Sequence, residues 1–213
     1  MADNLDLIEV CNWVLDAKAR GSKEITVNGV TFDDMVYDPA TGGRCQENVR
    51  KAFEAATGGP MPGAACCAGQ TEHELANLWH KDRVLGARMA ADWPRPTIWE
   101  SQVGDVVFFS GGPGCHTCGL PVGHVGIWLG NGQMFQQTSR AGLGITREGP
   151  TVEQQGRWTR SFQLLPIRGI MLVEATTGTV IATVEGLWRI IPGGDHLKDQ
   201  RKLYVERVDG ATG

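Results

Sequence analysis

Residues 104–139 read GDVVFFSGGPGCHTCGLPVGHVGIWLGNGQMFQQTS, and this stretch decides the fold. It holds two apolar runs, Asp105–Phe109 and His124–Leu129, separated by a loop rich in glycine and cysteine. An Asn-Gly pair, Asn131-Gly132, follows the second run. Valine, isoleucine, phenylalanine and tryptophan between glycine clusters are typical of β-strands. The stretch therefore predicts two strands of a small antiparallel sheet.

A polar residue stands at the start of the second predicted strand, where a core strand would usually carry an apolar side chain. His124 follows Gly123 and precedes the run VGIWL. A histidine at a strand end, beside a glycine-rich loop, can be oriented by the sheet and still reach a substrate. A catalytic role for His124 then requires a partner elsewhere in the chain.

A cysteine at the start of a predicted helix is the candidate partner. Cys45 opens the segment CQENVRKAFEAA, residues 45–56, which ends at TGGP. The positive end of the helix dipole and the free backbone N–H groups of the first turn both favour a thiolate. Cys45 is either a core cysteine that happens to begin a helix or a nucleophile. Its pairing with a distant strand histidine, His124, favours the nucleophile.

Three segments together resemble the NlpC/p60 and CHAP superfamily of papain-like cysteine peptidases, which includes cell-wall hydrolases and phage endolysins. The segments are GGRCQENVRKAF (42–53), GDVVFF (104–109) and GHVGIWLGNGQMF (123–135), and the resemblance covers roughly residues 37–168. Arg-Cys-Gln-Glu stands where many NlpC/p60 members have Asp-Cys-Ser-Gly. The resemblance implies a papain-like α+β fold of the NlpC/p60 type, with N-terminal helices packed on a central antiparallel β-sheet. It also implies that Cys45 and His124 are catalytic.

Family members orient the histidine with a third polar residue just past the turn, and by position this residue is Gln136. Strand register gives an independent test. If Asn131-Gly132 forms a two-residue loop, His124 shares its face of the sheet with Gln137. A three-residue loop, residues 130–132, shifts the count by one through a bulge and puts His124 opposite Gln136. We favour Gln136 over Gln137 and over a solvated strand residue with no role.

The mechanism implied by the resemblance is acyl transfer to a thiolate. Cys45 attacks an amide carbonyl, and His124 holds the proton and returns it to the leaving amine. The backbone N–H of Cys45, at the helix start, would face the oxyanion. Relatives often carry a tyrosine upstream of the cysteine, so Tyr37 is a candidate for a substrate or oxyanion contact.

Four further cysteines fall in two pairs. Cys66-Cys67 lies in a loop of glycine, alanine and proline, and Cys115-His-Thr-Cys118-Gly resembles a zinc knuckle. Four thiolates are the ligand set of many structural zinc sites, so one expectation is a structural zinc ion that stiffens the loops beside the active-site groove. Adjacent cysteines are awkward as paired ligands, and His116 or His80 could replace one of them. The cysteines could instead form disulfides after release from the cell, or remain free thiols. Catalysis by the thiol itself requires no cofactor.

Periodicity predicts the surrounding elements. Apolar residues at helical spacing predict helices at 4–19 and 71–91, the second with Thr71 and Glu74 as a capping box. Alternation around Asn28-Gly29 predicts a hairpin at 24–32.

Composition and charge exclude several kinds of partner. The chain has 213 residues and a net charge of −4, which gives no indication of nucleic-acid binding. No apolar run approaches the roughly 20 residues needed to cross a bilayer, so we expect no membrane span. Residues 1–20 are acidic and amphipathic and lack the basic and continuously apolar regions of a signal peptide. We expect synthesis in the cytoplasm without a signal peptide, and action at the cell wall after release or as part of a virion.

These observations predict one enzymatic domain with an appendage. Residues 1–168 would form the papain-like cysteine peptidase or amidase domain, and residues 169–213 a small β-rich C-terminal extension. The expected function is hydrolysis of amide bonds in bacterial peptidoglycan peptides, as a phage-type endolysin or virion-associated wall hydrolase. Two further hypotheses stay open. One is a toxin-like secreted effector amidase of the same fold, and the other is a non-catalytic, zinc-stabilised binding module in which Cys45 and His124 are core residues.

Overall fold

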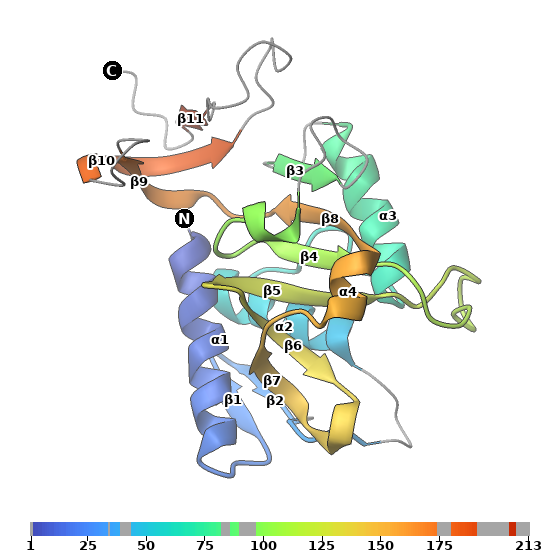
Figure 1. Cartoon of the computed structure of the whole chain (residues 1–213). Helices are drawn as coiled ribbons and strands as arrows, with labels where there is room; N and C mark the ends of the chain where they lie inside the picture. The colour runs from blue at the N-terminus through green and yellow to red at the C-terminus, as the bar shows by residue number, and fades with distance from the viewer. Residues whose placement is uncertain are drawn as a thin grey trace.

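A six-stranded antiparallel sheet forms the centre of the computed structural model, which describes residues 2–33, 35–38, 44–81, 86–89, 97–173, 180–190 and 205–207. The strand order is β3-β8-β4-β5-β6-β7 (Figure 1). The strands are β3 (Gly86–Met89), β4 (Val106–Phe109), β5 (His124–Gly130), β6 (Gln133–Thr138), β7 (Gly144–Glu148) and β8 (Trp158–Gln163). The glycine- and cysteine-rich loop joins β4 to β5, as the sequence predicts.

Three helices build the main core against one face of this sheet. They are α1 (Asn4–Ala19), α2 (Cys45–Thr57) and α3 (Ala68–Trp79). Helix α2 contacts β5 and β6, α1 packs on α2 and β7, and α3 contacts β4 and β5. Alternate strand residues point to this face, and the buried ones are Val106, Phe108, Val125, Ile127, Phe135, Ile145 and Phe162. The predicted α+β class, with helices packed on a central antiparallel sheet, is confirmed.

The other face of the sheet carries a smaller apolar cluster. Its members are Ile98, Val107, Phe109, Trp128, Met134 and Trp158. Ile98 comes from the short helix η1 (Ile98–Glu100). Helix α4 (Val152–Arg157) has no buried residue, lies in front of the sheet in Figure 1 and is held by a capping box between Thr151 and Gln154.

Two small sheets lie at the periphery. The hairpin predicted around Asn28-Gly29 forms β1 (Ile25–Val27) and β2 (Val30–Phe32). Strands β9 (Ile167–Val173), β10 (Val180–Ile190) and β11 (Val205–Arg207) form a three-stranded sheet, the β-rich C-terminal extension. Strand β9 crosses residue 168, and a domain boundary there stays a prediction.

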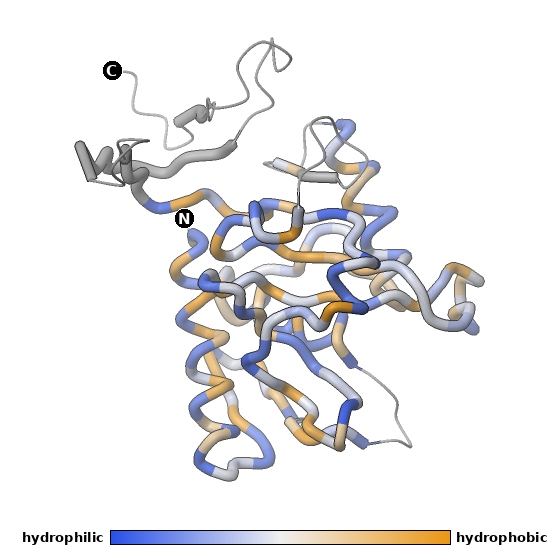
Figure 2. Tube along the Cα trace, viewed as in Figure 1, coloured by the Kyte–Doolittle hydropathy of each residue, from blue (hydrophilic) through white to orange (hydrophobic). Residues whose placement is uncertain are grey.

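Helix α1 matches its predicted bounds and buries Leu7, Val10, Cys11, Val14 and Leu15, while Leu5 and Trp13 remain exposed. Figure 2 shows hydrophobic and hydrophilic residues alternating along it, as expected for a helix that buries one side. None of the helices in the described part of the chain combines the length and apolar character needed to span a bilayer.

The predicted bounds of the third helix are wrong. Helix α3 begins at Ala68, three residues before Thr71, because the Cys67 side chain caps it by accepting the N–H of Gln70. Thr71 is buried inside the helix, and its hydroxyl accepts the N–H of Ala65 at 3.1 Å. The helix ends at Trp79, and residues 86–89 form strand β3 instead of continuing it. Residues 82–85, 90 and 91 of the predicted helix lie outside the described residues.

Candidate active site

The first turn of α2 is fixed by strands β5 and β6, and this places the thiol of Cys45. The backbone N–H of Arg44, just before the helix, donates to Gln137 Oε1. The backbone N–H groups of Val125 and Gln46 donate to the sulfur of Cys45. The thiol is half-buried, held between its own helix and the sheet.

The first residue of β5 supplies the imidazole. His124 Nε2 lies 2.7 Å from Gln136 Oε1, and because an amide oxygen only accepts, Nε2 carries the proton. This leaves Nδ1 for Cys45, with which the imidazole makes a side-chain hydrogen bond. The ring of Phe109 packs beside the imidazole with 5.7 Å between centroids. The structure thus brings Cys45, His124 and Gln136 together in one chain of contacts.

The charges and hydrogen bonds around Cys45 and His124 favour the charged forms of both side chains. Burial alone would raise the pKa of Cys45, but the nearby charge of His124 and the hydrogen bonds to the sulfur bring this pKa below its ordinary value. Burial alone would lower the pKa of His124, but the charge of Cys45 and the hydrogen bonds with Cys45 and Gln136 bring it above its ordinary value. A lowered thiol pKa beside a raised imidazole pKa is the condition for a thiolate–imidazolium pair.

Register explains how Gln136 reaches His124. Gln136 pairs directly with Gly126, so it meets His124 on the diagonal, whereas we expected it straight across. The loop has two residues, Asn131-Gly132, both at positive φ, and a bulge between Trp128 and Gly130 supplies the one-residue shift. Gly126 leaves the diagonal open, because a Cβ there would lie 2.6 Å from Met134 Cε and 3.3 Å from Gln136 Cβ.

Two glutamines whose roles the sequence did not predict hold this arrangement. Gln154 Nε2, from α4, donates to Gln136 Oε1 at 3.1 Å, so that oxygen accepts from both His124 and Gln154. Gln137, which the two-residue loop would have placed beside His124, anchors the backbone at the start of α2 instead. The Thr-x-x-Gln capping pattern marks the start of α4 in the sequence, but nothing local indicates the contact with Gln136.

The three residues line an open cleft of about 850 Å³. Tyr37 also lines it and is half-buried, so the structure brings this predicted residue to the same space as Cys45. Gln46 is a further lining residue, and its buried Nε2 has no hydrogen-bond partner among the described residues. A buried amide donor without a partner, on the residue next to a nucleophile, can serve a substrate oxygen once the side chain turns toward the cleft.

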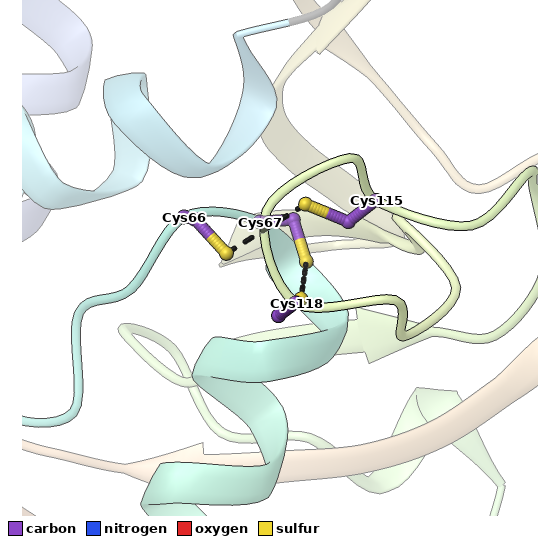
Figure 3. Close-up of side chains that lie close together, drawn as sticks. All are labelled: Cys66, Cys67, Cys115 and Cys118. Carbon is purple, nitrogen blue, oxygen red and sulfur yellow. Dashed lines mark hydrogen bonds between the residues drawn. The ribbon is translucent and has the colours of Figure 1, made fainter.

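The four cysteines predicted to bind zinc lie close together (Figure 3), and three of them, Cys66, Cys67 and Cys115, line the cleft. Cys66 Sγ lies 3.6 Å from Cys115 Sγ, and Cys67 Sγ lies 3.7 Å from Cys118 Sγ. All four sulfurs lie within 4.8 Å of one another, and none is in a disulfide. Backbone N–H groups, chiefly that of Cys118, donate to the Cys115 sulfur and lower its pKa to about 6. The cluster is compatible with a metal site, and neither His80 nor His116 belongs to it.

Comparisons with known proteins give only distant structural similarity. No family model matches the sequence, and no curated protein matches it. One solved structure, a Staphylococcus aureus protein described as similar to a lipoprotein of the NLP/P60 family, has 16% identity and a TM-score of 0.39. That match covers 74% of this chain and 42% of the other, so the chain spans less than half of that relative. The structure of Ly7917 has 15% identity and a TM-score of 0.36, with 90% of this chain and 88% of the other covered. Similarity at this level carries no functional argument.

Proposed function

We propose that the protein is a cysteine hydrolase that cleaves amide bonds, with Cys45 as nucleophile, His124 as general base and acid, and Gln136 as the residue that orients His124. The observation that carries the proposal is the chain of contacts from Cys45 to His124 to Gln136 at an open cleft. A core pair of the same types would have no reason to face a cleft of about 850 Å³, a size typical of ligand sites.

The mechanism follows from the charges of the pair. The Cys45 thiolate attacks the carbonyl carbon of the amide, forming a carbon–sulfur bond while the carbonyl electrons move to oxygen. The oxyanion collapses, the C–N bond breaks, and the imidazolium of His124 gives its proton to the leaving amine. Water, deprotonated by the now neutral imidazole, then attacks the thioester. The acid is released, and the thiolate and imidazolium are restored.

The oxyanion would be stabilised by two donors at the start of α2. One is the backbone N–H of Cys45, in the first turn, where the helix leaves N–H groups without helical partners. The other is the side-chain amide of Gln46, a residue that lines the cleft and whose buried Nε2 is unsatisfied among the described residues, so it would turn toward the oxyanion when substrate binds. Tyr37 is an alternative to Gln46 as the second donor, since it lines the same cleft.

Substitution separates these two candidate donors. If Gln46 supplies the second hydrogen bond, Gln46→Ala lowers kcat by about 10²-fold with a small effect on KM, because the bond forms in the transition state. Tyr37→Phe, the matched removal of one hydroxyl, then leaves kcat within about threefold of wild type. Steady-state kinetics on a fluorogenic peptide amide measures both. The opposite pattern assigns the role to Tyr37.

The substrate class we propose is the peptide part of bacterial peptidoglycan, as in a phage-type endolysin or a virion-associated wall hydrolase. The support is the motif resemblance to NlpC/p60 and CHAP peptidases. The test is digestion of purified wall, followed by identification of new ends. We expect new amino termini without new reducing sugar ends, and no new ends with Cys45→Ala. If wall products appear only after lysis from within, the protein is an endolysin. If they appear only in the periplasm of a rival cell, it is a secreted effector amidase.

We also propose that the four-cysteine cluster holds a structural zinc ion. Four sulfurs at about 2.3 Å from a tetrahedral zinc lie about 3.8 Å apart. Two observed pairs lie at 3.6 and 3.7 Å and all pairs lie within 4.8 Å, so zinc binding needs shifts of about 1 Å or less. Protein purified without chelator should contain one zinc per chain, and cobalt substitution should give the absorption of a tetrahedral thiolate site. Mass spectrometry distinguishes the three states of the cysteines by the mass of the chain. Bound zinc adds the mass of the metal, two disulfides lower the mass by four hydrogens, and free thiols leave the mass unchanged.

A further inference from the structure

We infer that zinc in the four-cysteine cluster is a positioning device for His124, so that metal occupancy sets the activity of the catalytic pair. The inference rests on the proposed function and adds regulation of its site. We call Cys66, Cys67, Cys115 and Cys118 the clasp, and residues 110–123 the knuckle loop.

The knuckle loop has no apolar core of its own. None of the residues from Ser110 to Gly123 is buried, whereas β4 before it and most of β5 after it are. In Figure 1 the loop extends away from the sheet between these strands. A segment without buried apolar side chains cannot offset the entropy of a fixed conformation by burial, so its position must come from cross-links.

Internal hydrogen bonds make the loop one unit. Cys115 N–H donates to Leu120 O at 2.7 Å, Val122 N–H to Pro113 O at 2.9 Å, and Gly123 N–H to Gly111 O at 2.9 Å. A hairpin tied in this way moves as a body. The loop meets the rest of the described chain through the clasp sulfurs and also at Gly111, beside the Arg157 guanidinium, and at Pro121, whose carbonyl lies against Gly69 of α3.

The far end of this unit is the backbone that carries His124. Gly69 N–H, in the first turn of α3, donates to Val122 O at 3.2 Å. A Cβ on Gly123 would lie 3.0 Å from Phe109 O and 3.3 Å from Gly69 N, so the chain passes closely between β4 and α3. Cys67 caps this same first turn of α3 and belongs to the clasp. A metal ion that joins Cys67 to Cys118 therefore fixes the contact from which His124 projects.

Coupling between metal occupancy and the position of His124 follows from these contacts. Without metal, four thiols close together attract one another weakly, and the loop is held on α3 by the hydrogen bond from Gly69 N–H to Val122 O and by packing of Pro121 against Gly69. With zinc, four metal–sulfur bonds join the two segments. Displacing His124 by about 1 Å is enough to lower a reaction rate by about 10²-fold, because nucleophile and base must keep their geometry. Since Cys66, Cys67 and Cys115 of the clasp also line the cleft, metal loss changes the cleft wall as well.

The experiment compares four proteins: wild type, the double variant Cys115→Ser/Cys118→Ser, Cys118→His and Leu120→Ala. Cys118→His keeps a zinc-competent ligand set, and Leu120→Ala changes a loop side chain outside the clasp. Bound zinc, kcat and the alkylation rate of Cys45 are measured, the last from its own peptide at about pH 6, where an unpaired thiol is unreactive. We expect the double variant to lose zinc, about 10²-fold in kcat and a similar factor in Cys45 alkylation. Leu120→Ala should match wild type, and Cys118→His should keep bound zinc and thereby recover most of the rate that the double variant loses.

Wild-type protein also provides an internal control for folding. Removing zinc with a chelator should slow Cys45 alkylation, and adding Zn²⁺ alone should restore it, with unchanged far-UV circular dichroism throughout. If wild type binds no zinc, or if zinc-free protein keeps the kcat and Cys45 alkylation rate of the zinc form, the inference is overturned. Alkylation needs no substrate, so zinc-dependent Cys45 reactivity without any amide hydrolysis would overturn the proposed function and leave the coupling standing.

Discussion

Replacing Cys45 with alanine is expected to lower kcat for amide hydrolysis by about 10⁴-fold or more, because the group that forms the acyl intermediate is gone. Cys45→Ser should lose nearly as much. A hydroxyl has a far higher pKa than a thiol, and the charge of His124 that brings the thiol below its ordinary pKa does not ionise serine. The measurement is initial rate on a peptide amide, with trapping of the acyl-enzyme by mass spectrometry.

Arg50→Ala is the matched control on the same helix. Arg50 forms an ion pair with Glu54 at 3.0 Å and does not line the cleft, so its loss should leave kcat unchanged. Thermal unfolding of all three variants shows whether α2 remains in place. Full activity in Cys45→Ala, with the helix intact, would exclude the thiol mechanism. Absence of hydrolysis by wild type as well would favour the binding module, in which Cys45 and His124 only pack.

The second large effect is on the pH range in which the Cys45 thiol is ionised. In wild type, the thiolate should persist below the pH at which ordinary thiols ionise, because its pKa is lowered, and the imidazolium should persist above the usual histidine range, because its pKa is raised. Activity is therefore bell-shaped, with its acid side set by Cys45 and its alkaline side by His124. In His124→Ala the charge and the hydrogen bond are lost, so the alkylation midpoint of Cys45 moves to higher pH, and kcat falls by about 10³-fold.

Iodoacetamide labelling across pH, read on the Cys45 peptide, measures the shift. Cys11 is the internal reference, since it is fully buried and its burial raises its pKa. It should react slowly at every pH and in both proteins. An alkylation profile of Cys45 that is the same in wild type and His124→Ala would show that the imidazole does not activate the thiol.

Much of this architecture was predictable from local pattern. Periodicity gave α1 its bounds, and alternation around glycine-rich turns gave β1, β2, β4 and β5, because these elements follow from which side chains a helix or strand buries. Helix α3 was misplaced because its cap is a cysteine, Cys67, and not the Thr71 that the capping-box rule favours. A cysteine at that position is not a recognised capping signal in a sequence.

The candidate site was predictable only where a residue's role comes from its own element. Cys45 at a helix start and His124 at a strand start can be identified in this way. The anchoring of Arg44 by Gln137 and the contact of Gln154 with Gln136 cannot, because each joins segments far apart in the chain. The bulge in β5 could not be predicted either. Two loop lengths were compatible with the sequence, and in the register that the structure adopts Trp128 packs against Met134 and its neighbours.

Neighbouring glutamines on β6 serve the two halves of the site from opposite sides of one strand. Gln136 contacts the imidazole, and Gln137 contacts the backbone before the thiol. An insertion or deletion of one residue in the β5–β6 hairpin would exchange their sides and detach both partners in a single event. Evolution can therefore change the length of this hairpin only in pairs of residues, or by adding a compensating bulge.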